Sequence, residues 1–358
     1  MAVRNGILLL IAVLLILSCP IQVSAVEDED GKYAPTEDYQ GWAKAKVATQ
    51  KEEPVKYIVP AILRKKYGKL ILNAAASSIS GYDNNVNLNR YDQDGSFFNQ
   101  NNLSIHGKYP IVKDKLYLKS GYDFTWIKYF KFSDPDLVDN VLSAGIETKL
   151  PKDLTWEVGY AADFVGFPRD KISRYTMNLL ETSLKQDVTG WLYHQIGYEF
   201  FHKHYPDWKT SNNNGELLER DRGDARNTVS HQVGVYVGDK TFVKLDNRFY
   251  RNTSNELFLQ FYDYKAFKTR TSLTHILTNK LYGSANFSYQ YKAYDKRSVA
   301  GKEFDQRDHL VTCGTSIFYD IIPSVSLGVS FDLMDNRSNE NQQKYEDCII
   351  SSGVYAVF

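Results

Sequence analysis

Residues 324–334 read SVSLGVSFDLM, and hydrophobic and polar side chains alternate strictly along this stretch. The hydrophobic positions are Val325, Leu327, Val329, Phe331 and Leu333. Successive side chains of a β-strand point to opposite faces, so residues two apart share a face. The stretch therefore predicts a strand that has one apolar face and one polar face.

The same period of two recurs from about residue 69 to the end of the chain. The segments that follow it are 69–82, 99–109, 115–131, 138–150, 153–166, 173–187, 190–205, 226–238, 240–253, 258–276, 280–295, 306–321, 323–335 and 345–358. They are about twice as long as the ~5–6 residues of an average strand in a soluble sheet, and they reach the ~9–11 residues that cross a bilayer at a tilt. We therefore predict an all-β fold, a transmembrane antiparallel up-and-down β-barrel of about 14 strands, with 12 to 16 as the range.

The connections between these segments alternate in length. The long ones are polar and span 83–98, 206–225, 296–305 and 336–344. Outer-membrane barrels have short turns on the periplasmic side and longer loops outside. An even strand count then places both ends of the barrel on the short-turn side. We expect the longest loop, in 206–225, to be an exposed surface loop, and the alternative is that it folds inward and narrows a pore.

The N-terminal segment differs from the rest of the chain. Arg4 precedes an apolar run at 7–17, and Val23-Ser24-Ala25 resembles a small-residue cleavage site. The run is shorter than the roughly 20 residues of a membrane helix. Residues 1–25 are therefore predicted to be a signal peptide that directs export to the bacterial outer membrane. The alternative is a lipoprotein signal with the lipid on Cys19.

Two further regions follow the signal peptide. Residues 26–66 are polar and interrupted by prolines, and we interpret them as a short periplasmic leader. Residues 67–358 form the predicted barrel domain. Only Cys313 and Cys348 remain after cleavage, which is too few for a disulfide framework.

The composition excludes some classes of function. The chain has 43 basic and 43 acidic residues, and this balance lacks the basic footprint of a nucleic-acid-binding protein. Aromatic residues make up 14% of the chain although its mean hydropathy is −0.43. Many aromatics in a polar chain favour strands with one apolar and one wet face.

If the apolar face meets lipid, the polar face lines the interior. The acidic candidates for pore-lining residues are Glu147, Glu157, Asp163, Glu181 and Glu199. The basic candidates are Lys244, Arg248, Lys268, Arg270 and Lys292. We expect the acids on one wall and the bases on the opposite wall, where they would set a transverse field across a hydrated lumen. This arrangement indicates passive diffusion of small hydrophilic solutes. The alternative is that the charges pair and close the lumen.

The sequence offers little support for catalysis, cofactors or metal. His202 and His204 share a strand face and two imidazoles so placed can bind a metal, but no third ligand is specified, so we expect solvated histidines and no metal site. No motif links a serine to a histidine, so we predict that the chain is not an enzyme and takes no cofactor. A change of parity near Ala266 and Phe267 predicts a bulge. Aromatics near strand ends, Tyr262 and Tyr264 among them, are expected to form girdles at the membrane interfaces.

The end of the chain, SSGVYAVF, finishes on Phe358. In this it resembles bacterial outer-membrane β-barrels, whose last strand usually ends in an aromatic residue. The resemblance implies that Phe358 is an assembly signal read by the barrel-assembly machinery. Ile350, Val354 and Ala356 would face lipid together with Phe358, and Tyr355 would lie on the other face.

A second resemblance rests on GYDNNVNL at 81–88 and DNRSN at 335–339. Both stretches resemble the barrel part of the surface-lipoprotein assembly modifier and related porin-like families. Export members of those families carry helical repeats before the barrel, for which residues 1–66 leave no room. The second hypothesis, from another class of function, is an export or surface-assembly barrel that works with a periplasmic partner through residues 26–66. The other expected partner is outer-membrane lipid.

Overall fold

The computed structural model describes residues 65–67, 70–91, 93–132, 135–258 and 262–357. The predicted signal peptide (1–25) and nearly all of the leader (26–66) lie outside the described residues. Within the described ranges, regular structure consists of fifteen strands and one 3-10 helix, η3 (Asn341–Gln343). No helix in this part of the chain is long and apolar enough to cross a membrane.

Fifteen strands follow one another along the described part of the chain. They are β1 (Lys65–Tyr67), β2 (Leu70–Asp83), β3 (Ser96–Val112), β4 (Leu116–Tyr129), β5 (Leu137–Leu150), β6 (Leu154–Gly166), β7 (Tyr175–Thr189), β8 (Leu192–Ser211), β9 (Leu217–Val237), β10 (Thr241–Ser254), β11 (Tyr264–Ile276), β12 (Leu281–Ser298), β13 (Asp305–Ile322), β14 (Val325–Ser338) and β15 (Tyr345–Val357).

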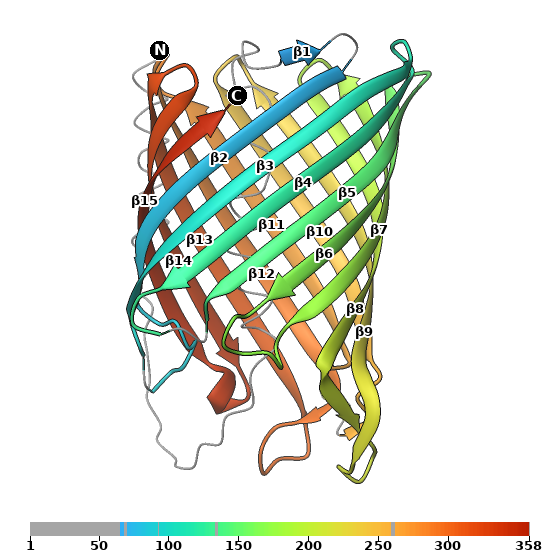
Figure 1. Ribbon diagram of the computed structural model, residues 1–358, viewed down its shortest axis with the longest axis vertical. Coiled ribbons are helices and arrows are strands. Elements are labelled where there is room, and N and C mark those ends of the chain that lie inside the picture. Colours follow the sequence, from blue (N-terminus) through green and yellow to red (C-terminus); the bar gives the residue numbers. More distant parts are fainter. Residues whose placement is uncertain (1–64, 68–69, 92, 133–134, 259–261, 358) are drawn as a thin grey trace. The chain divides into compact units, whose positions relative to one another are not determined.

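Strands β2 to β15 form a closed antiparallel barrel (Figure 1). Each strand pairs with its neighbours in sequence, and β15 pairs with β2 from Ile349↔Asp83 to Val357↔Ala75, which closes the ring. The short strand β1 pairs with β2. The predicted fold, a 14-stranded up-and-down barrel, is confirmed.

Short turns lie at one end of the barrel and longer loops at the other. At the short-turn end, a three-residue turn joins β5 to β6, and two of its residues, Lys152 and Asp153, have positive φ (64° and 55°). The start of β2 and the end of β15 lie at this same end, as predicted from the even count (Figure 1). We call the other end the long-loop end.

The outward face of the barrel carries apolar side chains on nearly every strand. Phe249 is 62% exposed and Val329 is 58% exposed. Others on this face are Leu142, Trp156, Leu180, Ile196, Val229, Phe287, Ile317 and Ile350. Soluble monomers rarely expose a continuous apolar patch above about 300–600 Å². A band that surrounds the barrel is typical of a lipid-facing surface.

The last strand follows the predicted parity. Ile350 and Val354 point outward and are exposed, whereas the Tyr355 ring lies 5.3 Å from the ring of Phe318 on the inward face. Phe358 lies outside the described residues, so its role as an assembly signal stays a prediction.

Two local expectations were wrong. Residues 206–225 are mostly strand, because β8 and β9 continue past the apolar band as a paired hairpin that turns at 212–216. The predicted bulge at Ala266 is absent, since β11 pairs with β10 and β12 without a shift in register. Ala266 instead belongs to an inward cluster with Tyr264 and Tyr294, which accounts for its apolar character. The register shift on this side lies in β12, between Ala293 and Ser298.

The turn of this hairpin is exposed. Leu217 is 76% exposed, and the Asn212 side chain accepts hydrogen bonds from the backbone N–H groups of Asn214 and Glu216 (2.9 and 3.0 Å). An asparagine that holds the turn in this way stabilises a local conformation. Exposure therefore holds for residues 213–220, whereas Thr210, Arg222 and Asp224 of the same segment are buried.

Candidate functional site: the lumen and its mouth

All ten predicted lining residues lie on the inward face of the barrel. Cross-strand register brings several of them together: Glu147 lies opposite Glu157, and Glu181 lies opposite Glu199. On the basic side, Arg248 lies opposite Lys268. We call the acids on β5–β8 the acidic sector and the bases on β10–β12 the basic sector. Whether they line a conducting pore is a proposal taken up below.

The two sectors adjoin at one side of the ring and face each other at the other side. Strands on opposite sides of a ring of 14 lie seven positions apart, as β5 and β12 do, whereas only β9 separates β8 from β10. Across β9, Arg248 Nη1 approaches Glu199 Oε1 to 3.6 Å. The field of these charges therefore runs along the wall between the two sectors as well as across the lumen.

Part of the acidic sector is neutralised by lysines that the sequence interpretation did not single out. Lys108 Nζ lies 2.7 Å from Glu147 Oε2, and Lys119 Nζ lies 3.0 Å from Glu157 Oε2. Lys149 Nζ also approaches Glu147 Oε1 (3.3 Å). Lys108 and Lys119 come from β3 and β4. Their inward parity was the signal that would have identified them.

Glu181 has a different environment from Glu147. Its side chain lies over Gly159, where a Cβ atom would come within 2.7 Å of Glu181 Oε1. Gly159 itself pairs with Gly145 on β5. Two glycines side by side on the inward face leave room for this carboxylate at the wall, and they keep the lumen wide at this level.

A second acidic sector begins next to the basic sector, on the side away from β9, and the sequence analysis did not predict it. Its carboxylates, one or two per strand on β13, β14, β15 and β2, are Asp308, Asp320, Asp332, Asp347 and Asp83. No lysine or arginine takes the inward parity on these four strands as the structure describes them. Small residues such as Gly314 occupy much of the remaining inward surface, and the Asp332 side chain lies over Gly314. The basic sector is thus flanked by carboxylates on both sides.

At the long-loop end the lumen contains an apolar cluster, which we call the mouth cluster. Loop 84–95 contributes Val86 and Leu88, which are only 2% and 6% exposed. The other buried members come from the inward faces of the strands and the β6–β7 connection: Phe98, Ile127, Tyr129, Leu137, Val165, Phe167, Tyr175, Tyr205, Tyr345 and Ile349. The first long loop therefore folds into the barrel mouth, a role that the sequence analysis raised only as the alternative for the 206–225 segment.

Loop 84–95 is fastened to the barrel wall by its asparagines. Asn85 Nδ2 donates to the carbonyl oxygen of Glu346 (2.6 Å). Asn84 exchanges two bonds with Cys348, one through its backbone N–H (3.1 Å) and one through its side-chain oxygen (2.6 Å). Leu88 has a φ of 52°, an uncommon conformation for a non-glycine residue. Burial of the Leu88 side chain compensates for this conformation.

The basic and aromatic residues of β8–β11 complete the mouth. The Arg222 guanidinium carbon lies 4.5 Å from the Tyr205 ring centroid and 3.2 Å from that of Tyr262, and Arg222 pairs with Asp224 (2.6 Å). Cations over aromatic faces gain about 0.5–2 kcal/mol. Tyr262 and Tyr264 thus lie inside the barrel and not in an interfacial girdle as expected.

No family model matches the chain, and no curated protein matches it. Solved structures do. The outer membrane channel DcaP of Acinetobacter baumannii superposes with a TM-score of 0.50 at 10% identity, covering 82% of this chain and 99% of that one. OmpT of Vibrio cholerae gives 0.49 at 11% identity (82% and 100% covered). The anion-selective porin from Comamonas acidovorans gives 0.47 at 11% identity (81% and 99%).

Identities this low bear on the fold alone. The closed ring of antiparallel strands, the encircling apolar band and the short turns at one end agree with that likeness. The chain is therefore a closed antiparallel β-barrel of 14 strands, a fold of the kind seen in the DcaP channel.

Proposed function

We propose that the protein is a porin-like channel for passive diffusion of small hydrophilic solutes across the bacterial outer membrane, with its long-loop end outside. The observation that carries the proposal is the inward placement of ten charged side chains inside an apolar outer band. Lys or Arg at mid-bilayer on the lipid face costs about 2–4 kcal/mol. These side chains are tolerated because the interior they face is wet.

The charged sectors give the channel a means of discrimination. A solute passing the mid-barrel level meets the basic sector with carboxylates on either side, so its own charges are oriented before it leaves. Passive diffusion of this kind needs no cofactor and no catalytic group. The export hypothesis rests on residues 26–66, nearly all of which lie outside the described residues.

Bilayer recording tests the channel directly. Purified full-length protein, reconstituted in a planar bilayer, is expected to insert and to produce discrete conductance steps. Protein that inserts, as judged by protease protection in vesicles, yet gives no steps would contradict the proposal and favour a closed lumen.

Thiol accessibility tests the wet interior independently of conduction. In a C313A/C348A background, we expect Ser183→Cys, which faces inward on β7, to react with a membrane-impermeant thiol reagent in vesicles. The matched control Leu184→Cys lies next to it on the lipid face, and 43% of Leu184 is exposed there. Because a thiolate forms poorly in hydrocarbon, its labelling should be slower by about tenfold or more. Equal labelling rates at positions 183 and 184 would show that inward and outward residues of β7 do not differ in their contact with water.

A further inference from the structure

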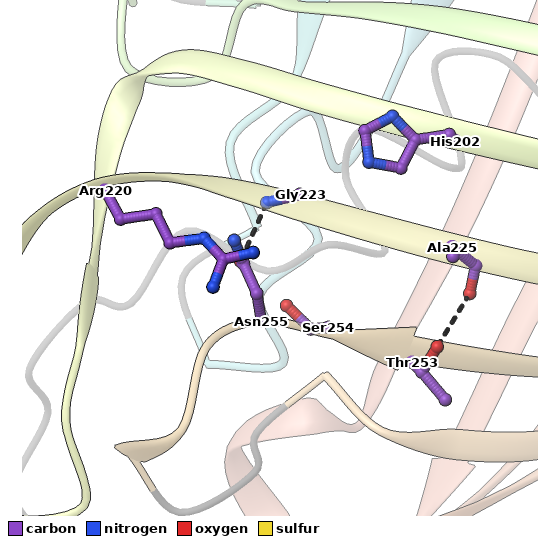
Figure 2. Close-up of a pocket in the computed structure, with 7 residues that line it drawn as sticks. All are labelled: His202, Arg220, Gly223, Ala225, Thr253, Ser254 and Asn255. Atoms are coloured by element: carbon purple, nitrogen blue, oxygen red, sulfur yellow. Dashed lines mark hydrogen bonds between the residues drawn. The ribbon is translucent and has the colours of Figure 1, made fainter.

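A shallow pocket of about 270 Å³ opens on the outward face of β8–β10 at the long-loop end (Figure 2). It is lined by His202, Arg220, Gly223, Ala225, Thr253, Ser254 and Asn255. The pocket lies outside the lumen, so the channel proposal does not use it.

Small residues on the middle strand create the pocket. His202 on β8, Ala225 on β9 and Thr253 on β10 are direct cross-strand neighbours. A Cβ atom on Gly223 would lie 3.2 Å from His202 Nε2. The hollow between the flanking strands therefore depends on the absence of a side chain at 223 and on a single methyl group at 225.

The pocket contains two polar side chains that are not otherwise engaged. Neither the Arg220 guanidinium nor the His202 imidazole makes a hydrogen bond or ion pair with another residue in the described part of the chain. Asn255 fixes the base of the pocket, because its side chain accepts from Gly223 N–H (2.8 Å) and donates to the Asp221 carbonyl oxygen (2.9 Å). Figure 2 shows the Arg220 guanidinium extended toward Gly223 and Asn255.

The nearby carboxylates are already engaged elsewhere. Asp221 pairs with Lys209 (2.5 Å), and this hydrogen bond lowers the pKa of the Asp221 carboxyl and raises that of Lys209. The Glu256 carboxylate accepts from the backbone N–H groups of Ser211 (3.0 Å) and Phe258 (3.0 Å). The charge left available at the pocket is therefore positive.

The position of the pocket suggests what occupies it. Phe200 and Phe249 precede the pocket on the outward faces of β8 and β10, so the pocket begins where the apolar band ends. On the same face, Arg251 and Lys265 share the single carboxylate of Asp295 (3.7 and 3.5 Å). The border between the apolar band and water is the level of lipid headgroups.

We propose that this pocket binds the phosphate of a lipid headgroup in the leaflet at the long-loop end. Guanidinium groups bind phosphate oxygens through two parallel hydrogen bonds. His202 supplies a further donor at the same hollow, whereas the Thr253 hydroxyl donates to the Ala225 carbonyl oxygen (3.4 Å; Figure 2). The occupant is a phosphorylated lipid with its chains on the adjacent apolar band.

The test measures lipid binding by the purified full-length barrel in micelles of an alkyl maltoside, a detergent without phosphate, and uses a phosphorylated glycolipid, its dephosphorylated form and inorganic phosphate as separate probes. We expect R220A/H202A to weaken retention of the phosphorylated glycolipid by about tenfold or more. Gly223→Val, which fills the pocket, should do the same. The matched control R307A removes an outward arginine at the same end of β13 and should leave binding unchanged.

Three results would overturn the proposal. Equal loss in R307A and R220A/H202A would show nonspecific attraction to the whole basic rim. Equal retention of the dephosphorylated glycolipid would exclude the phosphate. If inorganic phosphate displaced the phosphorylated glycolipid completely and bound as tightly as the glycolipid does, the pocket would be a site for a soluble anion. Heat-modifiable migration on gels identifies variants that have not formed a barrel. Gly223→Val and R220A/H202A change different features of the pocket, its volume and its donors, so each variant tests lipid binding independently of the other.

Discussion

Introducing aspartate at both Val86 and Leu88 is expected to raise single-channel conductance about twofold or more, because the loop that narrows the mouth no longer packs there. Burying each apolar side chain stabilises the closed arrangement by about 1.5–3 kcal/mol, and a carboxylate in the mouth cluster adds a desolvation cost. The loop lies outside the strand ladder, so the barrel itself should still form.

The matched control keeps the apolar character and nearly the volume of both side chains. Val86→Ile with Leu88→Met should leave the conductance at the parent value, since such exchanges usually cost less than about 1.5 kcal/mol. A folded V86D/L88D barrel that conducts like the parent would mean that loop 84–95 does not limit the flow.

Charge reversal in the basic sector should change ion selectivity. Lys268 and Arg270 follow each other on the inward face of β11, opposite Arg248 and Asp246. With glutamate at both positions, the basic sector loses most of its positive charge, and the two acidic sectors beside it then dominate the field in the lumen. We expect the permeability ratio to shift toward cations by about tenfold. The reversal potential in a salt gradient measures this shift.

The control makes one such charge reversal on the same strand but outside the lumen. Lys265→Glu lies on the outward face of β11, where Lys265 is exposed, and should leave the reversal potential unchanged. The converse pair, Glu181→Lys with Glu199→Lys, should shift selectivity toward anions. If K268E/R270E left selectivity unchanged, the basic sector would not lie on the conduction path.

The alternation of side chains was sufficient to predict the barrel. Val325, Leu327 and Val329 face lipid, and the residues between them face the interior. The order of side chains along one strand therefore indicates on which side of the barrel wall each residue lies. Strand length and the short turns then supplied the count and the direction of the chain.

The mouth cluster escaped prediction because it breaks that rule. Ile127 and Tyr129 are apolar residues at inward positions, where the alternating pattern predicts polar ones. They are buried in the same cluster as Val86 and Leu88 of loop 84–95, which explains their apolar character. Within that loop, Val86 and Leu88 are apolar in a polar context, which was the available signal.

Two other features depend on relations between strands that no local pattern contains. Lys108 reaches Glu147 across an intervening strand, so the ion pair needs the register and tilt of three strands. The β8–β9 extension continues after alternation of hydrophobicity has ended, because pairing persists in water where neither face needs to be apolar.

The seam between β2 and β15 makes the barrel dependent on its final residues. Tyr82 pairs with Ile350 there, so the first and last membrane strands must meet before the ring exists. A chain that stopped before β15 would present two unpaired edges, each open to pairing with other chains. We therefore expect nascent or truncated forms to aggregate, and their survival in the envelope to depend on whatever shields those edges until synthesis is complete.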